Sequence, residues 1–156
     1  MSSKVEERLK AAGIIIPAPT APAANYIPFT RVGDLVFVSG QIPMVDGKIE
    51  GVGKVGRDLD TDAAKKIAKI CAINLLSQVK AATYGNLDKV VQVVKLGGFV
   101  NCVDDFTEQP EVVNGASDLM VLAFESRGRH SRFAVGTNAL PRGVSVEVEG
   151  VFQIEL

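Results

Sequence analysis

The stretch VSVEVEGVFQIEL, residues 144–156, alternates between apolar and polar side chains along its length. Its even positions carry valine, phenylalanine, isoleucine, leucine and one glycine, whereas most of its odd positions carry serine, glutamate or glutamine. Successive side chains of a β-strand point to opposite faces of a sheet, so this period of two residues predicts a strand with one buried face. The rest of the chain must supply the apolar layer that covers this face.

Two helices are predicted to form that layer. The longer helix is capped by Asp60 or Thr61 and runs to about Tyr84, with Gly85 as its terminator. Its apolar side chains recur at steps of three and four residues, as on a helix that lies on a sheet: Ala64, Ile67, Cys71, Leu75, Val79 and Ala82. The second helix carries Pro110 in its first turn, and its side chains available for burial are Val112, Val113, Leu119, Val121, Leu122 and Phe124.

Further strands are predicted on both sides of the long helix. Residues 27–31 and 35–39 form a hairpin around Gly33-Asp34. Residues 89–101 are nearly continuously apolar, which predicts a strand buried on both faces, with Gly97-Gly98 as a bulge or a close backbone approach. Part of the segment 126–143 also reads as a strand. This order of elements predicts an α+β fold, a mixed β-sheet with two main helices packed on one face.

Residues 1–24 are predicted to form an N-terminal helix and a Pro/Ala-rich arm, followed by a single domain over residues 25–156. Ser2 or Ser3 caps the short helix, and the prolines that follow it predict an extended arm packed over the body. The apolar run near the N-terminus is shorter than the roughly 7–15 residues of a secretory signal. No stretch reaches the roughly 18–20 apolar residues of a membrane span. We therefore expect a cytoplasmic protein without membrane attachment.

The composition argues against several classes of function. Seventeen basic and eighteen acidic residues give a net charge of −1, which provides no electrostatic footprint for nucleic acid. The single histidine, His130, is predicted to lie in a solvated basic turn. Cys71 and Cys102 lie in apolar segments and lack the CxxC spacing of a metal or redox site. The glycine-rich residues 51–56 lack the GK[ST] ending of a phosphate-binding loop. The sequence thus predicts no metal and no cofactor.

Two charged residues stand out as candidates for chemistry. Arg132 lies in a predicted strand, and its planar guanidinium matches the two oxygens of a carboxylate. Glu147 lies on the polar side of the last strand and could act as a general base on water, although Glu149 shares that face and competes for the role. Each also has an ordinary structural interpretation, Arg132 as a surface residue or the partner of a structural glutamate and Glu147 as an exposed strand carboxylate. These residues alone indicate a carboxylate site without specifying a reaction.

Three segments, taken together, narrow the choice of family. Tyr26 lies thirteen residues before SGQIP (residues 39–43), FTEQPEVVN ends in Asn114, and SRFAVGTNALPRGVSVEVEG spans residues 131–150. In this order and spacing they resemble the YjgF/RidA family, the reactive-intermediate (imine) deaminases, also known as endoribonuclease L-PSP-like proteins. The resemblance extends from about residue 24 to the C-terminus.

The resemblance implies a chorismate-mutase-like fold and a homotrimer with pockets between subunits. It implies a cofactor-independent hydrolase, a deaminase that converts enamine/imine intermediates of amino acids (2-aminoacrylate-like) to 2-oxo acids and ammonia. Arg132 would hold the substrate carboxylate and Glu147 would position or activate water. The implied pocket is lined by Tyr26, Ser39, Gly40, Asn114, Arg132 and Ala134.

One departure from the family concerns Ala134, because many members carry cysteine at this position. If the position contributes mainly its backbone N–H, the implied deaminase activity survives the change, whereas thiol-dependent chemistry does not. A non-catalytic carboxylate-binding or regulatory trimer is an alternative that needs Arg132 but not Glu147. A ribonuclease is a third interpretation, and the near-neutral charge disfavours it.

Overall fold

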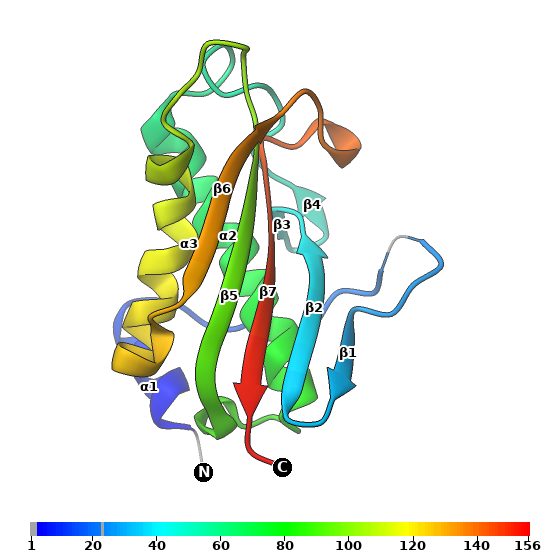
Figure 1. Cartoon of the computed structure of the whole chain (residues 1–156), viewed down its shortest axis with the longest axis vertical. Coiled ribbons are helices and arrows are strands. Elements are labelled where there is room, and N and C mark those ends of the chain that lie inside the picture. Colours follow the sequence, from blue (N-terminus) through cyan, green and yellow to red (C-terminus); the bar gives the residue numbers. More distant parts are fainter. Residues whose placement is uncertain (1–2, 23) are drawn as a thin grey trace.

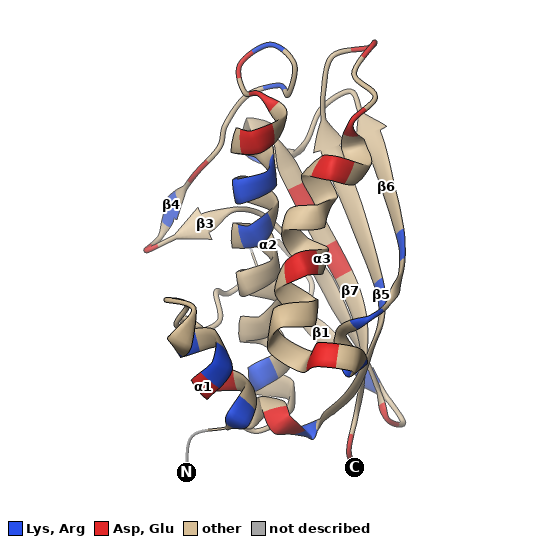
Figure 2. Ribbon diagram, turned by 90° about the vertical axis from the view of Figure 1, so that its left-hand side faces the viewer, with Lys and Arg blue, Asp and Glu red and all other residues tan. Residues whose placement is uncertain are grey.

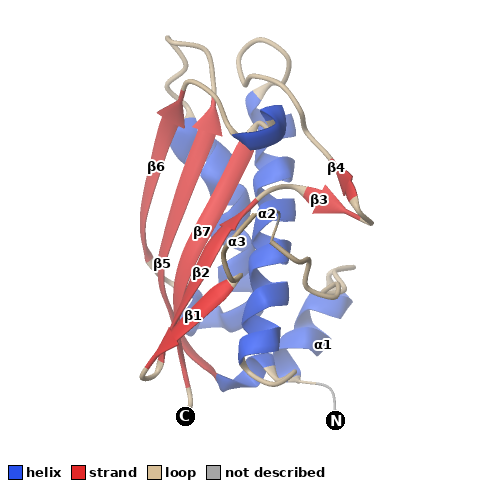
Figure 3. Ribbon diagram, turned by 90° about the vertical axis from the view of Figure 1, so that its right-hand side faces the viewer, coloured by secondary structure: helices blue, strands red, loops and turns tan. Residues whose placement is uncertain are grey.

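A five-stranded sheet forms one layer of the molecule, and the α-helices cover one of its faces (Figure 1, Figure 3). The computed structural model describes residues 3–22 and 24–156. Its elements are α1 (Lys4–Ala11), β1 (Phe29–Val32), β2 (Leu35–Gln41), β3 (Met44–Val45), β4 (Lys48–Ile49), α2 (Thr61–Ala82), η1 (Leu87–Lys89), β5 (Val90–Asn101), α3 (Gln109–Phe124), η2 (Glu125–Gly128), β6 (Ser131–Thr137), η3 (Pro141–Gly143) and β7 (Val146–Ile154).

The strands of the main sheet follow the order β1-β2-β7-β5-β6, and β3 pairs with β4 in a separate small hairpin. Strands β5 and β6 are parallel, whereas the other neighbours in the sheet are antiparallel. The predicted α+β class with a mixed sheet is therefore confirmed. In this order β7 is the central strand, which places its two glutamates in the middle of the sheet.

The alternation that predicted β7 decides which of its faces is buried. The even-numbered side chains lie in the core under the helices and are almost inaccessible to solvent: Val146, Val148, Phe152 and Ile154. Gly150 belongs to the same row, and a Cβ at this position would lie only 2.8 Å from the ring of Phe152. The odd-numbered side chains, including Glu147, face the side of the sheet that carries no helix. We call this side the open face.

Helices α2 and α3 pack closely on each other and on the sheet. Asp60 caps α2 by accepting a hydrogen bond from the backbone N–H of Ala63 at 2.8 Å. Gly115 of α3 lies against the backbone carbonyl of Lys65, so only glycine permits this helix–helix distance. The expected burial of Val121 and Leu122 is wrong. Both side chains are exposed because the buried face of α3 recurs at other positions: Val112, Val113, Ala116, Leu119, Met120 and Ala123.

The glycine pair in β5 marks a close approach of other side chains rather than a bulge. The register shifts of β5 lie near its start, between Val90 and Lys95. Gly97 lies under the ring of Phe133 on the open face, and Gly98 lies against Val113 of α3. The expected burial of β5 on both faces is correct only in part, because Lys95 is exposed.

The described part of the N-terminal segment packs on the same core. Ser3 caps α1 by accepting from the backbone N–H of Glu6 at 3.0 Å, while Ser2, the alternative cap, lies outside the described residues. Val5 and Leu9 are fully buried. The arm that follows is held on α2, because Ser77 donates to the carbonyl of Pro17 and Gln78 donates to that of Thr20. The expected packing of the arm is correct only in part, because the arm is bound to α2 by these contacts while most of its described residues are exposed.

Charges of both signs lie on the outer side of the helical layer. Figure 2 shows basic residues along α2 beside acidic residues along α3, and Lys65 lies 3.6 Å from Asp118 across the two helices. This side of the molecule therefore carries no surface patch of purely positive or purely negative charge. Within residues 3–22 and 24–156, no helix combines the length and the apolar character that a bilayer span requires.

Candidate active site

The strand exit SGQIP creates an opening beside the central strand. Strand β1 pairs with β2 only up to Val38, and the pairing of β2 with β7 shifts register between Val38 and Gln41. At this irregularity Gly40 faces Glu147, and a Cβ on Gly40 would lie 3.0 Å from Cδ of Glu147 and closer still to Oε1. Glycine at this position leaves room for the glutamate side chain, which occupies the space that a Cβ would take.

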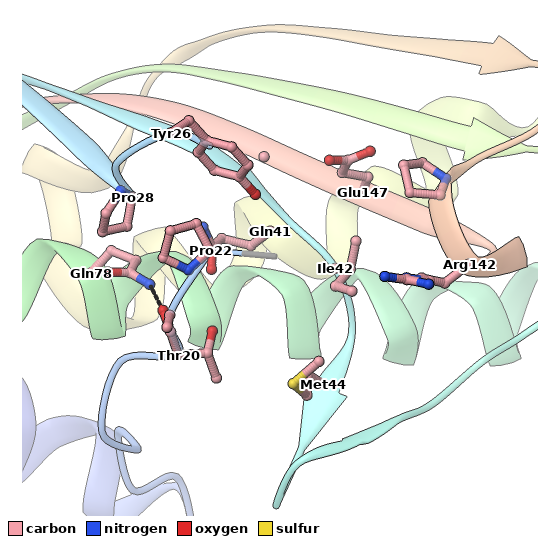
Figure 4. Close-up of a pocket in the computed structure, with 13 residues that line it drawn as sticks. Thr20, Pro22, Tyr26, Pro28, Gln41, Ile42, Met44, Gln78, Arg142 and Glu147 are labelled. Atoms are coloured by element: carbon pink, nitrogen blue, oxygen red, sulfur yellow. Dashed lines mark hydrogen bonds between the residues drawn. The ribbon is translucent and has the colours of Figure 1, made fainter. Parts of the chain in front are cut away.

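A cavity of about 140 Å³ opens at this strand exit (Figure 4). It lies between β2, the start of β7, the proline arm and the turn before β7. This volume is below the roughly 300–1,000 Å³ of pockets for drug-sized ligands, so it suits a small metabolite. The lining residues are Thr20, Ala21, Pro22, Tyr26, Pro28, Gly40, Gln41, Ile42, Met44, Gln78, Pro141, Arg142 and Glu147.

Glu147 is the acidic side chain of this cavity, and its environment makes it a stronger base than an exposed carboxylate. Burial raises the pKa of Glu147 above its ordinary value, and the nearby charge of Glu149 raises it further. Within the described residues, no hydrogen bond or ion pair reaches the Glu147 carboxylate. A half-buried carboxylate without donors is suited to accept a proton from water.

Two further polar side chains point into the same cavity. Tyr26, Glu147 and Arg142 all line this cavity, and Figure 4 shows the polar ends of their side chains arranged around Ile42. Arg142 is not among the site residues predicted from the sequence. Its backbone is left-handed, with φ of +61°, and its side chain makes no hydrogen bond or ion pair within the described residues. The sequence feature that could have indicated Arg142 is its position in the Pro141-Arg142-Gly143 turn, just before the strand of Glu147.

Arg132 lies elsewhere, in a second polar cluster between β6 and α3. Its guanidinium donates to Asn114 Oδ1 at 2.8 Å, to Ser117 Oγ at 3.1 Å and to the Pro110 carbonyl at 3.4 Å. All three acceptors are neutral. No ion pair among the described residues involves Arg132, so its positive charge is held in place without being compensated.

His130 belongs to this second cluster, which corrects the expectation of a solvated turn. The ring is half-buried, with Nε2 2.8 Å from Ser117 Oγ and Nδ1 2.6 Å from the Gly128 carbonyl. Burial lowers the pKa of His130 below its ordinary value, the Gly128 carbonyl opposes this change, and the charge of Arg132 adds to it. The turn η2 folds the ring back toward α3, which a local sequence pattern does not reveal.

The two clusters lie on opposite faces of the sheet. Arg132 pairs with Leu96, whose side chain is buried under the helices, whereas Glu147 pairs with Phe99 on the open face. Strand β5 also separates the two residues within the sheet. Arg132 and Glu147 therefore do not line one cavity within a single chain.

The other candidate residues are divided in the same way. Tyr26 and Gly40 lie with Glu147 in the cavity, and Asn114 lies with Arg132. Ser39 does not line the cavity, and its hydroxyl donates to the Ile27 carbonyl at 3.2 Å. Ala134 pairs with Gly98 and packs against the core beneath α3.

Comparison with known proteins shows the family of this chain. Residues 6–149 match the family model described as "YjgF/chorismate_mutase-like, putative endoribonuclease". The chain therefore belongs to the YjgF/chorismate mutase-like family, and the predicted chorismate-mutase-like fold is confirmed. The matched region begins inside α1 and includes the arm. The division into residues 1–24 and 25–156 stays a prediction.

Individual relatives match this chain along nearly its whole length. Protein TCP17 of Trypanosoma cruzi is 43% identical over 154 residues, which cover 98% of this chain and 96% of the relative. The crystal structure of Atu1372 from Agrobacterium tumefaciens, of unknown function, has a TM-score of 0.92 at 48% identity and covers 97% of this chain and 92% of its own. A "putative endoribonuclease" from Shewanella oneidensis MR-1 has a TM-score of 0.93 at 31% identity, with coverages of 96% and 99%.

Proposed function

We propose that this protein is a deaminase that hydrolyses enamines and imines derived from amino acids, such as 2-aminoacrylate, to 2-oxo acids and ammonia. Membership of the YjgF family supports this class of function. The observation that carries the proposal is the state of Arg132, whose guanidinium is fixed by three neutral acceptors and lacks a carboxylate partner within the described residues. Such a group is prepared to bind the carboxylate that every amino-acid-derived imine carries.

We further propose that the working site lies between copies of the chain in a homotrimer. Arg132 and Glu147 lie on opposite faces of one sheet, so a site that uses both must take them from two copies. The open face supports this assembly, because Phe37 and Val135 are 45% and 42% exposed there beside the ring pair of Phe99 and Phe133. Apolar side chains gathered on an exposed sheet face are typical of a protein–protein contact.

In the proposed mechanism, Arg132 of one copy holds the substrate carboxylate and fixes the adjacent C=N carbon near Glu147 of its neighbour. Glu147 takes a proton from water as the water oxygen bonds to this carbon, the π electron pair moves to the nitrogen, and the protonated Glu147 returns this proton to the nitrogen. In the resulting tetrahedral intermediate, Glu147 takes the hydroxyl proton and passes it to the amino nitrogen, so that the C=O bond forms, the C–N bond breaks, ammonia leaves and Glu147 is again ionised. An enamine first gains a proton on carbon and loses one from nitrogen to become the imine. Orientation of water and substrate supplies much of the acceleration.

The test is a competition between the protein and a chemical trap. Alanine is oxidised in situ by an amino-acid oxidase to 2-iminopropionate, in the presence of semicarbazide, which captures the imine before it hydrolyses. We expect wild type to lower the yield of trapped imine and to raise the rate of pyruvate and ammonia formation. The absence of acceleration over buffer across a panel of amino-acid-derived imines would refute the deaminase.

The Arg132 series identifies the carboxylate contact in this assay. Hydrogen bonds to charged groups are worth roughly 1.5–3 kcal/mol, so Arg132→Ala should lower kcat/KM by about 10- to 100-fold. Arg132→Lys keeps the charge without the planar fork and should recover only part of the loss. Arg31→Ala, in the exposed strand β1, is the matched control and should leave kcat/KM unchanged.

A non-catalytic carboxylate-binding or regulatory trimer is the second candidate, because the Arg132 cluster forms without any contribution from Glu147. Glu147→Gln separates the two functions. An enzyme keeps its affinity for a small 2-oxo acid and loses turnover, whereas a binding protein keeps its affinity and shows no turnover even as wild type. For either function we propose a location in the cytoplasm, where the thiols of Cys71 and Cys102 remain free.

A further inference from the structure

A chain of hydrogen bonds leads from the backbone of η2 to the guanidinium of Arg132. The Gly128 carbonyl lies 2.6 Å from His130 Nδ1, and His130 Nε2 lies 2.8 Å from Ser117 Oγ. The same Ser117 oxygen lies 3.1 Å from Nη1 of Arg132. His130 thus reaches Arg132 through one hydroxyl group, although the proposed mechanism gives the histidine no part.

The partners fix the direction of two of these bonds. The guanidinium can only donate and the Gly128 carbonyl can only accept, so Ser117 Oγ accepts from Arg132 and His130 Nδ1–H donates to Gly128. In the neutral ring Nε2 then carries no proton and accepts from the Ser117 hydroxyl. Only the neutral imidazole with its proton on Nδ1 satisfies all three contacts with Ser117 turned in this direction.

The charged groups around His130 agree with a neutral ring. On α3, Asp118 next to Ser117 is directed to Lys65, and on η2 Arg127 donates to the Val90 carbonyl. On β5, Lys95 lies over the ring of Phe133 on the open face. Arg129, next to His130 in the sequence, is exposed. Arg132 is the charged group that affects the protonation of the His130 ring. Both the burial of the ring and this neighbouring cation lower the pKa of His130.

We propose that His130 is a positioning residue that, through Ser117, sets the direction of the Arg132 guanidinium toward a ligand carboxylate. Asn114 holds the same Nη1 atom from the next turn of α3, so His130 and Ser117 supply the second fixed contact of that nitrogen. With Nη1 anchored in this way and Nη2 donating one N–H to the Pro110 carbonyl, the guanidinium presents its remaining N–H groups in a fixed plane. This role rests on the proposed function only in that the ligand carries a carboxylate.

The variants separate positioning from simple packing. His130→Leu removes the acceptor and should raise KM for a carboxylate-bearing imine about tenfold while leaving kcat within a few-fold. His130→Gln retains an acceptor oxygen for Ser117 and should recover most of the affinity. Ser117→Ala should match His130→Leu, and the double variant should be no worse than either, because the two residues act in one chain. Equal losses of affinity in His130→Leu and His130→Gln would overturn the proposal. So would a double variant whose loss of affinity is the sum of the two single losses.

Two measurements do not depend on turnover. Nitrogen NMR of the wild type should show the neutral Nδ1–H tautomer at pH 7, and saturation with pyruvate should raise the pKa of His130, because the bound anion offsets the charge of Arg132. Calorimetry with pyruvate should show the same order of affinities as the KM values. A ring protonated on Nε2 at pH 7, or wild type that binds no pyruvate, would overturn the inference. Pyruvate binding that depends on His130 without any imine turnover would instead refute the deaminase alone.

Discussion

Gly40 of β2 and Glu147 of β7 are in contact at the strand exit, and a Cβ on Gly40 would overlap the glutamate carboxylate. The overlapping atoms belong to the end of a flexible side chain, so the fold can absorb a methyl group by displacing the carboxylate. Gly40→Ala should therefore remain folded and lose at least about tenfold in kcat/KM, because catalytic groups tolerate little misplacement.

The double variant Gly40→Ala/Glu147→Ala is the control for this prediction. Removing the glutamate side chain makes room for the methyl group, so the cost in thermal stability of Gly40→Ala should disappear in the Glu147→Ala background. A Gly40→Ala protein with wild-type kcat/KM would show that the contact has no role in placing Glu147.

The raised pKa of Glu147 gives opposite pH trends for activity and stability. A general base must be ionised, so kcat/KM should fall as pH falls through the raised pKa of Glu147. The folded state binds its proton more tightly than the unfolded chain, so the free energy of unfolding should decrease as pH rises from the ordinary glutamate pKa through the folded one. Paired pH–rate and thermal-unfolding profiles measure both trends.

Glu147→Gln should remove both trends at once. The variant should be at least as stable as wild type at pH 7, because it avoids an ionised carboxylate in a half-buried place. Destabilisation by Glu147→Gln at pH 7 would mean that the carboxylate contributes to the fold rather than to the chemistry.

Subunit mixing tests the division of the site between copies. Arg132→Ala should keep at most about a tenth of wild-type activity and Glu147→Gln should lose turnover, whereas trimers refolded from an equal mixture should regain activity. About one quarter of the interfaces would then pair an intact Arg132 with an intact Glu147, since each of the two neighbours is suitable half of the time. Activity near one quarter of wild type supports intersubunit sites. A stable 16.5 kDa monomer in ultracentrifugation, or no recovery in mixed trimers, contradicts them.

The left-handed backbone of Arg142 predicts a conflict between stability and ligand affinity. Non-glycine residues with φ near +61° are strained by roughly 1–2 kcal/mol, and glycine relieves that strain. Arg142→Gly should therefore raise the unfolding temperature by a few degrees, while loss of the cation from the cavity should weaken binding of pyruvate. Asparagine tolerates the left-handed conformation, so Arg142→Asn separates the effect of the lost charge on pyruvate binding from the effect of backbone strain on stability. Unchanged pyruvate affinity in both variants would exclude Arg142 from the site.

Local patterns were sufficient to predict the layers of this protein. The two-residue period of residues 144–156 predicted the buried face of β7, and capping residues with an apolar stripe predicted α2. Such signals depend on neighbours within one element, where side-chain direction follows from backbone geometry alone. The site motifs could likewise be found in the sequence, because SGQIP and the segment around Glu147 are short and continuous.

Only the tertiary structure decided which candidate residues meet. In β6, a local pattern would place Phe133 and Val135 in the core, yet both lie on the open face. The small residues Ala134 and Gly136 take the helix side instead, where Ala134 packs against the core and a Cβ on Gly136 would lie 2.9 Å from Cys102 Sγ. This choice directs Arg132 toward α3, where it meets Asn114 and the Ser117–His130 pair. It also separates Arg132 from Glu147, since the face taken by each strand depends on packing across the sheet and not on the strand's own sequence.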